Sequence, residues 1–68
     1  MYNSVNRVGK AYTRFSPHGV GQIQIELDGK LSVVDAVSRF PEEIKAFEQI
    51  RVVAVESNVI YIEKLLNS

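Results

Sequence analysis

The sequence contains no cysteine and no tryptophan. Without thiols it can form neither a disulfide bond nor a thiolate metal site, so packing and backbone hydrogen bonds must hold its 68 residues together. A chain of this length forms one small domain, and such a domain buries only about 60% of the surface that its unfolded form exposes. We therefore expect the stability of the fold to be modest.

An excess of charge of either sign is also absent, because eight Lys and Arg residues balance eight Asp and Glu residues. A net charge near zero gives no overall field that would attract nucleic-acid phosphates or an anionic membrane surface. No apolar run approaches the roughly 18 residues that span a bilayer, and residues 1–7 contain no signal-peptide core. The chain as written is predicted to be soluble, which says nothing about a longer, membrane-anchored parent.

What the sequence does contain is the alternation of β-strands. From Gln22 to Leu27 polar and apolar residues alternate, which is the pattern of a strand with one face toward a core. This predicts a strand at 20–27, preceded by a Ser-Pro-His-Gly corner at 16–19 and by a first strand at 8–15. The apolar residues of that first strand break strict alternation, so we expect a bulge or bend within it.

The Asp28-Gly29 pair that follows predicts a two-residue hairpin with a type I′ turn. A third strand should then run from residue 30 to residue 38. Its apolar phase changes from Leu31 and Val33 to Val34 and Ala36, and this change predicts a bulge.

Residues 39–49 interrupt the strand pattern. Pro41 and the two glutamates after it suit the first turn of a short helix, which would direct Ile44 and Phe47 toward the core. Strands at 50–56 and 59–64 follow, joined by a turn at Ser57-Asn58. The predicted core of the strands consists of Ile23, Ile25, Leu31, Val33, Val52, Ile60 and Ile62.

Five short strands with one interruption, between the third and the fourth, predict an all-β fold. The best match is a five-stranded OB-fold Greek-key barrel with a short helical or irregular connection between strands 3 and 4. A closed barrel also removes the exposed sheet edges that promote aggregation. An SH3-like barrel is the alternative. The predicted organisation is a flexible N-terminal segment at 1–7, the barrel domain at 8–64 and a C-terminal tail at 65–68.

Residues that could carry chemistry are few. His18 is the only histidine and has no cysteine or second histidine with which to share a metal, and no serine lies in a Gly-x-Ser-x-Gly context. Asp35 lies among valines, where a hydrogen-bonded structural role is the simpler interpretation. We therefore predict no enzyme activity, no catalytic residue, no cofactor and no metal.

Several strings in the sequence are similar to the soluble C-terminal domain of NfeD-like proteins, above all to short members of the YuaF type. They are VGKAYT at 8–13, SPHGVG at 16–21, DGK at 28–30, IRVVAVE at 50–56 and SNVIYIE at 57–63. The resemblance covers residues 6 to 64. It differs at residues 45–48, where Lys-Ala-Phe-Glu stands in place of the Lys-Gly or similar turn that many family members have.

The resemblance implies an OB-fold barrel that is tethered behind transmembrane helices at the cytoplasmic face of a bacterial cell membrane. It also implies work beside flotillin- or stomatin-like membrane scaffold proteins, with self-association as a further option. The expected function is thus a non-catalytic protein-interaction domain. Candidate partner-binding residues are Phe40 in the 39–49 connection, and Arg14 and Tyr61 on the terminal strands, because interfaces favour aromatic residues and arginine.

The alternative function is that of a module for single-stranded nucleic acid. OB-folds that bind such strands use stacking aromatic residues and a basic groove. The candidates for this role are Arg7, Lys10, Tyr12, Arg14, Phe15 and Tyr61. The zero net charge and the aromatic demand of a core argue against it, so no nucleic acid is expected as a partner.

Overall fold

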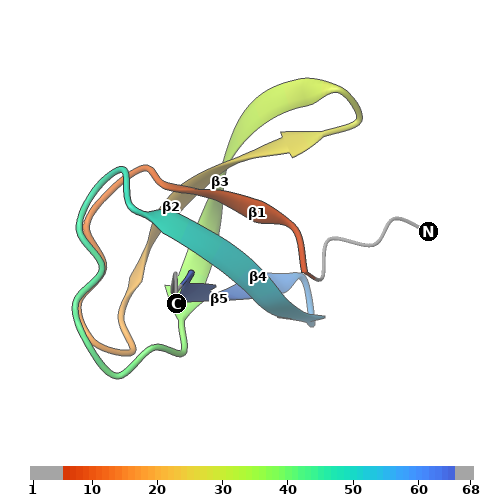
Figure 1. Ribbon diagram of the computed structural model, residues 1–68. Coiled ribbons are helices and arrows are strands. Elements are labelled where there is room, and N and C mark those ends of the chain that lie inside the picture. Colours follow the sequence, from red (N-terminus) through yellow and green to blue (C-terminus); the bar gives the residue numbers. More distant parts are fainter. Residues whose placement is uncertain (1–5, 66–68) are drawn as a thin grey trace.

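The computed structural model describes residues 6–65. Its five strands are β1 (Val8–Ala11), β2 (Val20–Leu27), β3 (Lys30–Ser38), β4 (Gln49–Glu56) and β5 (Val59–Lys64). They close into a barrel in the order β1-β2-β3-β5-β4, and no helix occurs between residues 6 and 65 (Figure 1). The predicted all-β, OB-fold barrel is confirmed, and the connection between strands 3 and 4 is the irregular one of the two forms expected.

Neighbouring strands are antiparallel except for β3 and β5, which pair in parallel at Val37 and Ser38. The first strand ends at Ala11 rather than near residue 15. Beyond it, the N–H groups of Tyr12 and Thr13 both donate to the carbonyl of Gln22, at 2.8 and 3.3 Å. Two residues thus face one acceptor, and the bend predicted for this strand is confirmed.

Both tight hairpins have the backbone that their sequences predict. Asp28 and Gly29 have φ values of 52° and 78°, and a type I′ turn requires positive φ at both positions. Ser57 and Asn58 repeat the pattern at 50° and 66°.

The bulge predicted in β3 is wrong. β3 keeps an unbroken register with β2, from Lys30 opposite Leu27 to Val37 opposite Val20. Alternation therefore runs uninterrupted, and it turns Leu31 and Val33 outward, where they are 69% and 42% exposed. Their predicted burial is wrong for the same reason.

A register shift occurs instead in β4, between Val52 and Ala54. The extra residue at this point changes which side chains face inward. Val52 is buried before the shift, and Val55 rather than Ala54 packs against the core after it.

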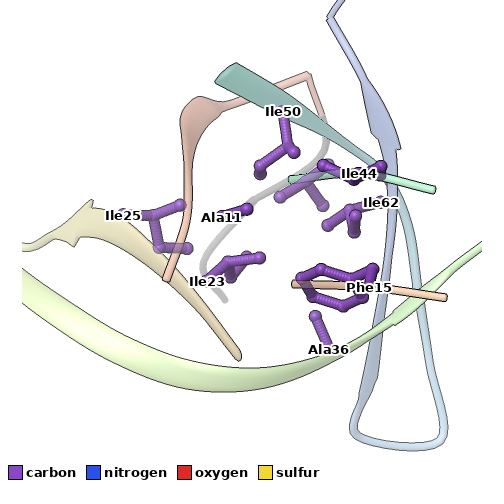
Figure 2. Close-up of a cluster of buried hydrophobic side chains, with 9 residues drawn as sticks. Ala11, Phe15, Ile23, Ile25, Ala36, Ile44, Ile50 and Ile62 are labelled. Carbon is purple, nitrogen blue, oxygen red and sulfur yellow. The ribbon is translucent and has the colours of Figure 1, made fainter. Parts of the chain in front are cut away.

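The core lies inside the barrel, where side chains from all five strands and both long connections converge (Figure 2). Burial of four predicted strand residues is confirmed, and Ile60 packs against the cluster while partly exposed. The buried apolar residues are Ala11, Phe15, Ile23, Ile25, Ala36, Ile44, Ile50, Val52 and Ile62.

Gly9 allows β1 to pack closely on β2. A Cβ atom at this position would lie 2.5 Å from the carbonyl oxygen of Gln24 and would collide with the side chain of Ile25. No residue with a side chain fits here unless the two strands separate.

The described residues just outside the barrel strands are also hydrogen-bonded. The N–H of Asn6 donates to the carbonyl of Val52 at 2.7 Å, and the N–H of Val52 donates to the carbonyl of Arg7 at 2.9 Å. At the other end, the N–H of Leu65 donates to the carbonyl of Gln49 at 3.0 Å. The flexible segment predicted at 1–7 and the tail predicted at 65–68 otherwise lie outside the described residues.

Candidate partner-binding surface

Two long connections, residues 12–19 and 39–48, run side by side at one end of the barrel (Figure 1). We call this the closed end. Phe15 and Ile44 form an isolated antiparallel bridge with N–H···O distances of 2.8 and 3.0 Å. The N–H of His18 donates to Phe40 at 3.1 Å, and the N–H of Phe47 donates to Ala11 at 2.7 Å. Backbone hydrogen bonds therefore join the two connections along their length.

This pairing explains why the helix that Pro41 and its following glutamates suggested does not form. A helix needs the N–H of each residue to reach the carbonyl four positions earlier. The N–H of Ile44 is instead bonded to Phe15 of the other connection, and the N–H of Phe47 to Ala11 at the end of β1. Ile44 still reaches the core, together with Phe15, and neither side chain is exposed.

Phe47 is the most unusual residue of the closed end. The N–H of Glu48 donates to the carbonyl of Lys45 at 3.2 Å, which makes Lys45–Glu48 a β-turn with Phe47 at its third position. Phe47 has a φ of 70° and is 69% exposed. Turns with positive φ at this position favour glycine, and a bulky residue there is strained by on the order of 1–3 kcal/mol.

The predicted burial of Phe47 is wrong. A residue three positions after Ile44 shares its side only in a helix. In the turn that forms here, the side chain of Phe47 points to solvent instead.

Electrostatic contacts hold the same turn. The N–H of Lys45 donates to Glu48 Oε1 at 2.8 Å, and Lys64 Nζ lies 3.1 Å from Glu48 Oε2. The hydrogen bond from the Lys45 backbone, followed by the contact with Lys64, lowers the pKa of Glu48 below its ordinary value. The turn that presents Phe47 is thus fixed on both sides by one carboxylate.

Of the three predicted partner-binding residues, Phe40 and Arg14 lie in the two connections of this end, and Tyr61 lies in β5. Phe40 is half-buried and packs against the core, and its N–H donates to the Oγ of the buried Ser38 at 3.0 Å. Arg14 Nε lies 3.2 Å from Glu43 Oε2, and both side chains are exposed. The structure therefore keeps Phe40 partly exposed while it packs against the core, and pairs Arg14 with a residue of the neighbouring connection.

Tyr61 contacts different residues from those that Arg14 contacts. The guanidinium of Arg39 lies 4.0 Å from the centre of the Tyr61 ring, and the same group is 3.3 Å from Glu56. The role of Phe40, Arg14 and Tyr61 in binding a partner stays a prediction.

Residues considered for chemistry have structural surroundings. His18 is an exposed turn residue with a φ of 54°. Asp35 is exposed and accepts a hydrogen bond from Gln22 Nε2 at 3.3 Å. Within residues 6–65, no group of three or more His, Cys, Asp or Glu residues could hold a metal ion. That part of the chain also contains no helix with the length and apolar character needed to span a bilayer.

The residues suggested for binding single-stranded nucleic acid do not form one exposed surface of aromatic and basic side chains. Phe15 is fully buried in the core, so its ring cannot stack on a base. Tyr12 is about half exposed, whereas Tyr61 lies against Arg39. The Arg7 side chain donates to the Glu26 carbonyl at 3.1 Å.

Sequence reasoning missed the exposure of Phe47 at the closed end and, away from this surface, that of the β3 residues Leu31 and Val33. One signal for Phe47 was present in the resemblance, which implies a Lys-Gly or similar turn where this chain has Lys-Ala-Phe-Glu at 45–48. Glycine in a turn indicates a position of positive φ.

No family model matches the chain, and no curated protein sequence matches it. Among solved structures, the chain is similar to the soluble domain of the NfeD protein YuaF from Bacillus subtilis, determined in solution. The two are 27% identical and superpose with a TM-score of 0.72. The similarity covers 87% of this chain and 70% of the other. The similarity of fold therefore extends over most of the barrel.

Proposed function

We propose that the chain, which is similar to the soluble domain of an NfeD protein, is a non-catalytic protein-interaction domain. In this proposal it is the soluble head of a membrane-anchored protein, on the cytoplasmic side of a bacterial membrane. Its partner is a flotillin- or stomatin-like membrane scaffold protein. The barrel supplies a rigid support, and the closed end supplies the contact surface.

One observation carries the proposal, namely the strained and exposed ring of Phe47. A large apolar side chain in solvent gains nothing from the fold, and a φ of 70° makes the residue unfavourable at its position. Strain of this kind concentrates at functional sites. Buried aromatic anchors supply much of the affinity at interfaces, so docking of the ring would compensate for both costs.

The neighbours of Phe47 suit the edge of an interface. Two charged pairs lie at this end of the barrel: Glu48 of the turn pairs with Lys64 of β5, and Arg14 pairs with Glu43 between the two connections. Interfaces combine a buried apolar centre with a polar, solvent-accessible rim. The partner site that fits this surface is an apolar pocket large enough for one phenyl ring, bordered by charged groups.

The test exchanges Phe47 for glycine. Phe47→Gly removes the ring and relieves the backbone, so the fold should be at least as stable as wild type while the partner is lost. Phe47→Tyr is the matched control, because it keeps a ring on the same backbone. Binding is measured by pull-down and titration with the flotillin- or stomatin-like protein encoded beside the parent, and the melting temperature is measured in parallel.

We expect Phe47→Gly to weaken binding at least about tenfold, the effect of losing one anchor, and Phe47→Tyr to bind nearly as wild type. Wild-type affinity in Phe47→Gly would contradict the proposed surface. Arg14→Ala tests the rim and should weaken binding less, with an unchanged melting temperature.

Phe40→Ser tests the core side of the same connection. Phe40 packs against the core, so this change should lower stability as well as binding. Tyr61→Ala tests whether the contact surface extends beyond the closed end to the remaining candidate, Tyr61. If Tyr61 belongs to the contact surface, this variant binds the partner more weakly than wild type.

A further inference from the structure

The outer edge of β3 lacks a partner strand over most of its length. β2 pairs with β3 from residue 30 to residue 37, whereas β5 pairs with it only at Val37 and Ser38. Among residues 6–65, the stretch from residue 30 to residue 36 is therefore paired on one side alone. Figure 1 shows the hairpin of β2 and β3 projecting away from the barrel at this point.

Hydrogen bonds at the end of β3 identify the backbone groups on that edge. The N–H of Ser38 donates toward the β2 side, to Gly19 at 2.8 Å, and the N–H of Arg39 donates to Ile62 of β5 at 2.9 Å. Successive residues of a strand direct their N–H and C=O groups to opposite sides, and the register with β2 is unbroken. The residues whose backbone groups point to the unpaired edge are Leu31, Val33 and Asp35.

Asp35 places an exposed charge at one end of this edge, but the side chains on either side of Ser32 do not protect it. Natural edge strands commonly carry charged residues or proline, which discourage the addition of another strand. Here two aliphatic residues, Leu31 and Val33, are 69% and 42% exposed on the same outer face. Exposed backbone groups with alternate apolar side chains are the features that allow an extended strand to add to a sheet.

We propose that this edge pairs with the same edge of a second copy of the chain, in an antiparallel ribbon centred on Ser32. A two-fold axis at Ser32 places Leu31 of one copy opposite Val33 of the other, and Val33 opposite Leu31. Both pairs occupy hydrogen-bonding positions, and the four aliphatic side chains lie on one face.

Three properties of the chain favour a second copy as the occupant. The pairing is self-complementary in both backbone direction and side-chain type. The net charge of the chain is zero, so two copies do not repel each other overall. The hairpin projects from the barrel, which leaves room for an identical hairpin to approach.

The expected contact is small. A ribbon of about six residues per copy buries less than the roughly 1,200 Å² of a stable complex, so the pairing is weak and reversible. High local concentration strengthens such contacts. The inference rests on the proposed function only in treating the domain as an interaction module. The pairing surface on β3 does not include Phe47, so the two proposals can be tested separately.

The experiment follows self-association of the wild-type domain by sedimentation and by NMR, from about 10 μM to about 1 mM, the range in which weak contacts become populated. The test variants are Leu31→Lys and Val33→Lys, each of which places a charge on the edge. The matched control is Val20→Lys, since Val20 is a 75% exposed valine of β2, away from the unpaired edge.

We expect the wild type to dimerise as concentration rises, with contacts between Leu31 of one copy and Val33 of the other. Each test variant should raise the dissociation constant at least about tenfold, as for a central interface position, and Val20→Lys should match wild type. A wild type that stays monomeric to about 1 mM overturns the proposal, whether or not another protein's strand occupies the edge.

Equal disruption by Val20→Lys, or undiminished association of both test variants, overturns it as well. Contacts between Leu31 of one wild-type copy and Val33 of the other, observed by NMR, would establish the register of the ribbon without any variant. Phe47→Gly should associate as wild type does, so failure of this proposal and failure of the proposed function give different results.

Discussion

The closed end and the β3 edge differ in how their backbone hydrogen-bonding groups are satisfied. At the closed end, two irregular connections satisfy each other's backbone hydrogen bonds, and one residue, Phe47, adopts an unfavourable conformation to complete the turn. At the β3 edge, Asp28 and Gly29 form a relaxed turn, but one row of backbone groups has no partner strand within the described chain. Strain marks one candidate interface, and unused hydrogen-bonding capacity marks the other.

The two regions should differ most in their contribution to the free energy of unfolding. Phe15 is fully buried at the closed end, so Phe15→Ala should cost about 3–5 kcal/mol, close to the whole stability of a small domain. Leu31→Ala at the exposed edge should change stability by less than about 0.5 kcal/mol. Urea denaturation measures both, and similar losses in the two variants would show that the edge is part of the core.

Two serines of β3 extend the comparison to hydrogen bonding. Ser38→Ala leaves the N–H of Phe40 without its acceptor in a partly buried place, which should cost about 1–3 kcal/mol. Ser32→Ala, at the edge, should cost less than about 0.5 kcal/mol. Thermal unfolding compares the two, and a Ser38→Ala variant as stable as Ser32→Ala would mean that water replaces the lost acceptor.

The two turns should respond in opposite directions to changes that involve glycine. Gly29→Ala places a side chain at a φ of 78° and should cost about 1–2 kcal/mol. Phe47→Gly relieves a similar strain but adds freedom to the unfolded chain, so a net gain of about 0.5–1 kcal/mol is expected. A loss of stability in Phe47→Gly would show that the ring, despite its exposure, packs on the fold.

The smallest effect concerns pH. Because hydrogen bonds from Lys45 and Lys64 depress the pKa of Glu48, its ionised form stabilises the fold above the unfolded pKa of about 4.3. This contribution is lost as the pH falls through the depressed folded pKa. Stability curves of wild type and Glu48→Gln should therefore converge in acid and separate near neutrality. Parallel curves over the whole range would mean that the carboxylate does not support the turn.

Much of the barrel could be predicted because its signals are local. Alternation in 20–27 and the Asp28-Gly29 pair specify a hairpin without reference to the rest of the chain. The bend after Ala11 and the irregular connection before β4 could be anticipated as breaks in a pattern, although not in their geometry. The chain's similarity to an NfeD soluble domain was likewise carried by turn glycines and β-branched runs.

The exposed residues could not be predicted, because their positions depend on distant partners. Leu31 and Val33 alternate as core residues do. The unbroken register with β2 shows that they face outward, and the short pairing with β5 shows that they lie at an edge. Phe47 was assigned to the core from its spacing to Ile44. The bonds to the other connection, which replace the helix, cannot be read from residues 39–48 alone.

Residue-resolved hydrogen exchange in dilute solution tests the contrast between the two regions most directly. Amides bonded across the closed end, those of Ala11, Phe15, Ile44 and Phe47, should exchange slowly, since each has a backbone acceptor. Along β3, Ser32 and Val34 should be protected, and Leu31, Val33 and Asp35 should exchange fast. Equal protection of both sets along β3 at low concentration would contradict the account, because it would place a partner on this edge within a single chain.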